Sequence, residues 1–145
     1  MSNHCALVGR PKRWMKCARR GAALVESALA TTVFLMLTFG IIDFGRMIYS
    51  YNSVSHLARE ATRYASVRGN SSGHPASASD VTQAVRNRAV GLNLSLLSVT
   101  TTWQPSNAPG DTVRVTVSYD FRPAVPLVPA AYRNLRSTSR MVISQ

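Results

Sequence analysis

The sequence predicts an α+β protein in which one long N-terminal helix carries a small outer domain. Three observations predict this. An unbroken apolar run extends from Ala22 to Ile42, a helical repeat of apolar residues follows it, and the last third of the chain alternates with a period of two. Because the apolar run takes a large share of the 145 residues, the remainder can build only one modest core.

The apolar run is long enough to cross a bilayer, since roughly 20 apolar residues span the hydrocarbon layer. Six of the 17 basic residues precede the run, and no acid does: they are Arg10, Lys12, Arg13, Lys16, Arg19 and Arg20. Dense basic charge beside the first hydrophobic segment resists translocation. We therefore expect a basic cytoplasmic leader at residues 1–21, a transmembrane helix at 22–42, and the rest of the chain outside the cytoplasm.

The charge of the chain, +11 overall, is concentrated in this leader. From Ala22 onward, eleven arginines face six acids, which leaves a net charge of +5. A nucleic-acid partner would require basic residues gathered on one folded face, so none is predicted. Cys5 and Cys17 both precede the membrane run. The outer domain therefore has no disulfide, and no metal site or cofactor is expected.

The helix is expected to continue past Ile42 to about residue 68, because no proline occurs before Pro75. Apolar residues recur at spacings of three and four, namely Phe44, Met47, Ile48, Tyr51, Val54, Ala58, Ala61 and Ala65. His56 and Glu60 lie four apart on the polar side and are able to pair. The distal half of this stripe is expected to pack on the outer domain, whereas the membrane half must meet lipid or other subunits.

The outer domain at residues 69–145 is expected to contain a short helix and a small antiparallel sheet. Ser77 with Asp80, or Ser79 with Thr82, can cap the helix, and Gly91 or Asn93 can end it. Two alternating segments, 97–103 and 112–121, predict strands joined by the turn-rich loop Gln104–Asp111. After a proline-interrupted loop, residues 136–143 can return as a third strand.

An ordinary signal peptidase cuts after the apolar stretch, at an A-x-A-like site. The only triplet of this form near the run, Ala28-Leu29-Ala30, lies in the middle of it, so the sequence offers no good site for that enzyme. The stretch Arg19-Arg20-Gly21-Ala22-Ala23-Leu24-Val25-Glu26 instead is similar to the processing site of type IV prepilins, in which a basic leader ends in glycine and a glutamate stands five residues past the cut. This resemblance implies cleavage between Gly21 and Ala22. Ser27 departs from the pattern, since Flp-type prepilins usually place an aromatic residue there.

Residues 21 to 69 resemble the N-terminal module of the TadE family, minor pilins or pseudopilins of tight-adherence (Flp-type) pilus systems. The positions that carry the resemblance are Glu26, the segment Gly40–Arg46 and the segment Ala58–Ala65. The resemblance implies a pilin-like fold and a structural role in a pilus or secretion assembly. It also implies a single-pass location in the bacterial inner membrane, with the N-terminus inside and the C-terminus outside, and in a surface pilus once assembled. The implied partners are the bilayer, other pilin subunits, assembly-platform proteins and a prepilin peptidase.

Glu26 has two interpretations. After cleavage, Ala22 gains a free α-amino group. The Glu26 carboxylate, four residues on, can neutralise this amine in the same subunit or in a neighbouring one, and Glu26 would then be an assembly residue. Alternatively, Glu26 only reaches the headgroup layer near Arg20.

Two other classes of function remain open at this point. A permanently signal-anchored envelope protein with a ligand-binding or partner-binding outer domain is the main alternative to a pilin. An enzyme is disfavoured, because the sequence contains neither a G-x-S-x-G elbow, nor an H-E-x-x-H motif, nor a phosphate-binding glycine loop. No catalytic residue is therefore predicted.

Overall fold

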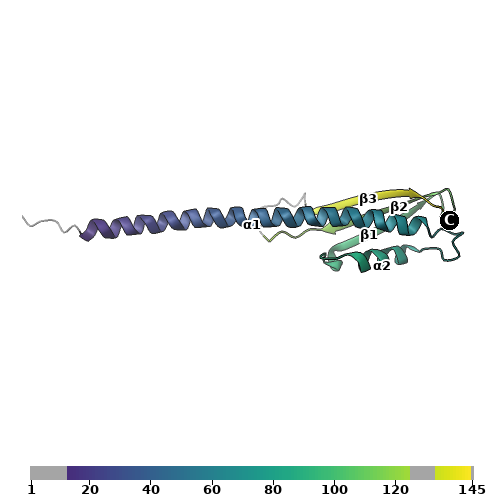
Figure 1. Cartoon of the computed structure of the whole chain (residues 1–145), viewed down its shortest axis with the longest axis horizontal. Helices are drawn as coiled ribbons and strands as arrows, with labels where there is room; N and C mark the ends of the chain where they lie inside the picture. The colour runs from purple at the N-terminus through teal and green to yellow at the C-terminus, as the bar shows by residue number, and fades with distance from the viewer. Residues whose placement is uncertain (1–12, 125–132, 145) are drawn as a thin grey trace, which may run out of the picture. The chain divides into compact units, whose positions relative to one another are not determined.

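A computed structural model describes residues 13–124 and 133–144, with side chains from residue 21 onward (Figure 1). The elements follow in the order α1 (Arg13–Ser66), α2 (Ala78–Arg88), a 3₁₀ turn η1 (Leu94–Leu96), β1 (Leu97–Gln104), β2 (Thr112–Asp120) and β3 (Asn134–Val142). The predicted α+β class, with its long helix, short helix and antiparallel sheet, is confirmed. The basic leader residues up to Lys12, the side chains of residues 13–20, and Pro126 and Pro129 lie outside this description.

The chain divides into two compact units, residues 1–39 and 40–145, and α1 runs through the boundary. In the described part of the first unit, α1 exposes its large apolar side chains, among them Leu24, Leu29 and Phe34 at 65–69%. Three hydroxyls there donate to carbonyls of their own helix: Ser27 to Leu24, Thr32 to Ala28 and Thr38 to Phe34. This segment thus satisfies most of its polar side chains locally and presents an apolar surface.

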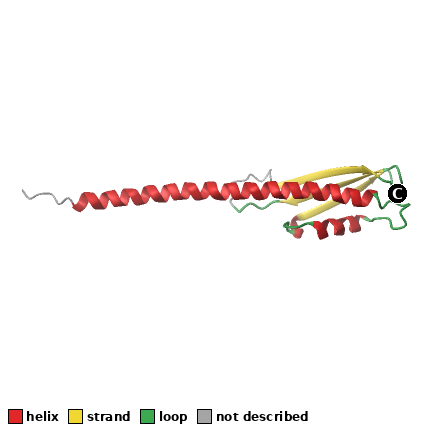
Figure 2. Ribbon diagram, viewed as in Figure 1, coloured by secondary structure: helices red, strands yellow, loops and turns green. Residues whose placement is uncertain are grey.

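The second unit is built on a three-stranded antiparallel sheet in the order β1-β2-β3. Leu97 of β1 faces Tyr119 of β2, and Tyr119 in turn faces Leu135 of β3. Figure 2 shows the strands beside the C-terminal half of α1, with α2 next to β1. The strands at 97–103 and 112–121 were predicted within one residue at each end, because each alternates apolar and polar side chains.

The core lies between the C-terminal half of α1 and the inner face of this sheet. Val113, Val115 and Val117 of β2 are completely buried, and they share one cluster with Val54, Leu57, Ala58, Ala61 and Ala65 of α1. Val81 and Val85 of α2 join the same cluster. The predicted stripe is therefore correct from Val54 onward. In the first half of the stripe, for which no packing on the outer domain was predicted, Phe44, Ile48 and Tyr51 stay 44–59% exposed.

Helix α2 begins with a complete capping box. The backbone N–H of Asp80 donates to the Ser77 hydroxyl, and the Asp80 carboxylate accepts from the Ser77 backbone N–H at 2.9 Å. The Ser77 hydroxyl also donates to the Asp80 carboxylate, at 2.6 Å. This hydrogen bond and, after it, the one from the Ser77 backbone N–H lower the pKa of Asp80 below its ordinary value. Of the two predicted caps, Ser77 with Asp80 is therefore the one that forms, and Ser79 lies inside the helix.

The chain leaves α2 through a glycine that the packing requires. Gly91 has φ +73°, and a Cβ atom there would lie 3.1 Å from the hydroxyl oxygen of Tyr49. The same hydroxyl donates to the carbonyl oxygen of Val90 at 3.2 Å. Tyr49 thus holds this connection close to α1, and the helix ends at Arg88, three residues before the predicted glycine.

Replacing Ser77 by Ala is expected to lower the free energy of unfolding by about 1 kcal/mol, since it leaves backbone N–H groups of α2 uncapped. The carboxylate of Asp80 stabilises the cap only while it is ionised, and its folded-state pKa is depressed. Its contribution is therefore present above the ordinary aspartate pKa of 3.8 and is lost as the pH falls through the folded value. Chemical denaturation of both proteins at pH 7 and at pH 3 measures this, and a difference that grows at low pH would contradict it.

Candidate functional site

The predicted site residues Gly21, Ala22 and Glu26 all lie on α1 and are exposed. Glu26 is the one charged residue in the apolar segment 21–42. Within the described side chains, no hydrogen bond or ion pair involves its carboxylate. An ionisable group in an apolar segment costs free energy unless it is paired or reaches water, so this carboxylate is the charged group of the segment for which a partner is expected.

Gly21 has no structural reason to be glycine in this helix. A Cβ atom built at Gly21 would meet nothing within 4 Å, and the same holds for Gly40 and Gly45. A larger residue at position 21 is therefore compatible with the folded helix, and if anything would favour it, since glycine weakens a helix by about 1 kcal/mol relative to alanine. Any requirement for glycine at this position must come from a molecule other than the folded chain.

The segment Gly40–Arg46 starts the second unit and contains a buried carboxylate. Asp43 has a side chain only 4% exposed, and Arg46 donates to its Oδ1 atom at 3.0 Å. The guanidinium of Arg46 also lies 5.7 Å from the centre of the Phe121 ring. This cluster joins α1 to the residue that follows β2. Although the resemblance had drawn attention to the segment, the contact with Phe121 could not be predicted from it.

The segment Ala58–Ala65 has an inner and an outer side. Its alanines and Thr62 are buried against the sheet, and the Thr62 hydroxyl donates to the carbonyl of Ala58 at 2.7 Å. On the outer side, Glu60 lies 3.5 Å from Arg63 and 3.7 Å from Arg88 of α2. Glu60 therefore pairs with arginines and links the two helices, where the sequence had suggested His56.

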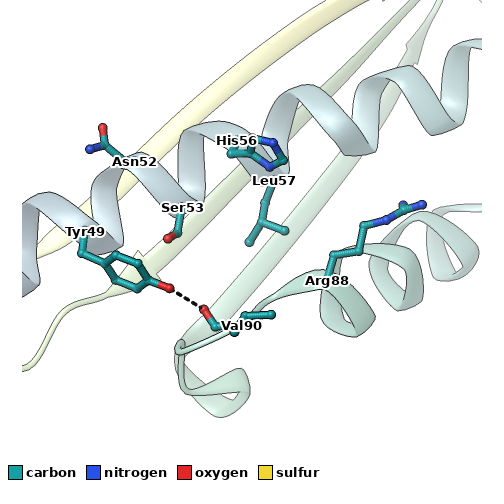
Figure 3. Close-up of a pocket in the computed structure, with 7 residues that line it drawn as sticks. All are labelled: Tyr49, Asn52, Ser53, His56, Leu57, Arg88 and Val90. Atoms are coloured by element: carbon teal, nitrogen blue, oxygen red, sulfur yellow. Dashed lines mark hydrogen bonds between the residues drawn. The ribbon is translucent and has the colours of Figure 1, made fainter.

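His56 instead lines an open groove between α1 and the end of α2 (Figure 3). The groove has a volume of about 340 Å³ and is bordered by Tyr49, Asn52, Ser53, Leu57, Arg88 and Val90 as well. In the close-up, the Tyr49 hydroxyl points across the groove to Val90, and His56 lies on the helix above Leu57. Among the described residues, no group of three His, Cys, Asp or Glu side chains could hold a metal ion.

Together these features define a class of protein: an α+β domain of three strands and two helices whose first helix continues into an exposed apolar segment. By its length and composition, that helix is long and apolar enough to cross a membrane. Residues 21–63 match the family of TadE-like proteins and form a TadE-like domain, as the resemblance had indicated. Proteins of this family are generally non-enzymatic and pilin-like. No curated protein and no solved structure matches the chain.

The matched range contains Glu26, the Asp43–Arg46 pair and most of the Ala58–Ala65 segment. Two of these three features have a structural role in the second unit. The Asp43–Arg46 pair connects α1 to Phe121, and the alanines of the Ala58–Ala65 segment belong to the core cluster. Glu26 has no such role in the described side chains. It is the residue of the domain whose presence the fold leaves unexplained.

Replacing Arg46 by Gln is expected to lower the free energy of unfolding of the second unit by about 1–3 kcal/mol, because the buried Asp43 carboxylate loses a charged donor. Arg59→Gln is the matched control. Arg59 is exposed on the same helix and forms no ion pair among the described residues, so a change within about 0.5 kcal/mol is expected. Denaturation of the full chain in detergent, followed by Trp103 fluorescence in a Trp14→Phe background, measures both, and equal losses would refute the role of the pair.

Proposed function

We propose that this chain is a TadE-like minor pilin or pseudopilin, a structural component of a tight-adherence (Flp-type) pilus or secretion assembly. It is anchored in the bacterial inner membrane by residues 22–42, with its N-terminus inside and its outer domain outside. The observation that carries the proposal is the TadE-like domain at residues 21–63, which includes the whole exposed apolar segment.

The exposed surface of α1 supports an assembly role. Ile41, Phe44, Ile48 and Tyr51 recur at spacings of three and four and are 44–72% exposed, so they form one apolar stripe within the second unit. The sheet covers the other side of this part of the helix, at Ser50 and Val54. Contiguous exposed apolar surface of this kind marks a site of contact with lipid or protein. In the proposed function, other pilin subunits cover this stripe.

The proposed maturation step is the removal of residues 1–21 by a prepilin peptidase. Cleavage after Gly21 would create a free amine at Ala22, four residues before Glu26. This distance corresponds to about one helical turn, so the amine and the carboxylate fall on the same side of the helix. The carboxylate can then neutralise this amine or that of a neighbouring subunit while the apolar helices pack together.

Gly21→Leu is expected to abolish maturation while membrane insertion continues, since insertion depends on the basic leader and the apolar run. The folded helix has room for the new side chain, so failure to process would reflect the peptidase rather than misfolding. Ala23→Leu, an exposed substitution two residues along, serves as the control. N-terminal sequencing of the membrane fraction is the measurement. A native chain beginning at Ala22 supports the proposal, whereas one that always begins at Met1 favours the permanently anchored alternative.

Glu26→Leu is expected to be made, inserted and largely processed, but to be absent from the purified pilus assembly. Insertion should be at least as efficient as for the native chain, because a carboxylate at the membrane centre costs up to roughly 3 kcal/mol. Recovery of each variant with the assembly is measured after membrane fractionation.

Two conservative variants separate charge from shape at this position. Glu26→Gln keeps the size and removes the charge, so it should behave like Glu26→Leu. Glu26→Asp keeps the charge with a shorter reach, so it should give intermediate recovery. Normal recovery of the Leu and Gln variants would show that Glu26 only contacts the headgroup layer.

A further inference from the structure

The outer face of the sheet is the side turned away from the buried valines of β2. Its residues are the alternate positions of the three strands, and the register arranges them in rows across the sheet. The three central rows are Ser98–Ser118–Arg136, Thr100–Thr116–Thr138 and Thr102–Arg114–Arg140. The β1 and β3 members of these rows are exposed, and the β2 members are half-buried between them. We call these nine residues the outer face.

The outer face carries three arginines without acidic partners. Arg114 and Arg140 lie directly opposite each other, and like charges in that position destabilise a sheet. Within the described residues, none of the ion pairs includes Arg114, Arg136 or Arg140, and the Nε atom of Arg114 is buried without a hydrogen-bond partner. The nearest acid on this side, Asp120, lies 3.9 Å from Arg122. An anion bound between the two arginines would remove the repulsion.

A neutral row of hydroxyls separates the two charged rows. The hydroxyl oxygens of Thr116 and Thr138 lie 3.0 Å apart, and Thr100 extends the row onto β1. Arg136 and Arg140 are four residues apart on one strand, which is about 13 Å. The arginine guanidinium groups of β3 are therefore widely spaced, and the threonine hydroxyls between them can both donate and accept hydrogen bonds.

This pattern excludes several partners. The outer face has no aromatic and no large apolar residue, and the adjacent row, Gln104–Thr112–Val142, adds a single exposed valine. This side of the sheet therefore lacks the clustered anchors of a protein interface and the side chains that would enter a lipid surface. A second copy of this chain does not fit, because its six acids are scattered and Asp43 and Glu60 already contact arginines. Double-stranded DNA carries one charge per about 1.7 Å of axis, far denser than the arginines here.

We propose that the outer face binds an extended acidic polysaccharide, a polymer of sugars with carboxylate or sulfate groups one or two sugars apart. The guanidinium groups bind the anionic oxygens in two charged rows, and the threonine row exchanges hydrogen bonds with the sugar hydroxyls between them. Arginine suits this task because its planar fork binds a carboxylate with two parallel hydrogen bonds. This surface is independent of Glu26 and of the assembly role proposed above.

The test uses the full chain in detergent and a fluorescent hyaluronan oligosaccharide, which carries a carboxylate on every second sugar. Binding is expected to weaken as salt is added. The double variant Arg136→Gln/Arg140→Gln should lose at least tenfold in affinity, and Thr138→Val should lose severalfold. The matched control is Arg59→Gln/Arg86→Gln, which removes the same charge from exposed positions of α1 and α2 and should bind like the native chain.

Three results would overturn the proposal. One is equal binding of a dextran oligosaccharide, which has hydroxyls but no charge. Another is an equal loss in the control double variant, which would mean that only net charge matters. The third is tighter binding of duplex DNA than of hyaluronan, which would make the outer face a nucleic-acid surface. Glu26→Leu should bind hyaluronan normally, so failure of the assembly proposal and failure of this one are distinguishable.

Discussion

The contact between the small side chains of α1 and the valines of β2 determines the rest of the second unit. Ala58, Ala61 and Ala65 are at most 2% exposed, and they share one core cluster with the three completely buried valines. Because β2 is the central strand, this one contact also positions β1 and β3, which pair with β2 along its length. The pairing register of β1 and β3 with β2 also aligns the arginines and threonines of the outer face in rows.

The second constraint is the limited reach of the sheet. It covers α1 on one side from about Ser50 onward, and among the described side chains of the helix before that point Asp43 alone is buried. A single helix thus has two parts, one with exposed apolar side chains before residue 43 and one that is half-buried after Ser50. The exposed stripe of Ile41, Phe44, Ile48 and Tyr51 connects the two parts. In the proposed assembly, the protein uses that stripe for partners that its own chain does not supply.

Local patterns predicted most of the fold. The capping box of Ser77 and Asp80 and the alternation of the two main strands both depend on neighbours within a few residues, and both appear as expected. The burial of Asp43 and the link from Glu60 to Arg88 depend on segments far apart in the chain, so no periodic pattern could predict them. Periodicity likewise groups Phe44 with Val54 on one stripe but does not say where the covering sheet ends. For the candidate site, Gly21, Ala22 and Glu26 came from a motif, and the fold adds only that they are exposed and that Gly21 has open space around it.

The end of the chain is fastened to the end of the long helix. After β3, the N–H of Ile143 donates to the carbonyl of Asp111 at 2.8 Å, and the N–H of Ser144 donates to the carbonyl of Ser66 at 2.9 Å. The Ser144–Ser66 bond and the contact of Arg46 with Phe121 thus hold the outer domain to α1 at two separate places. Mechanical tension on the outer domain along the helix axis would therefore be shared between the two attachments. The domain would resist peeling from its helix, a property that the proposed assembly role would require in a fibre under load.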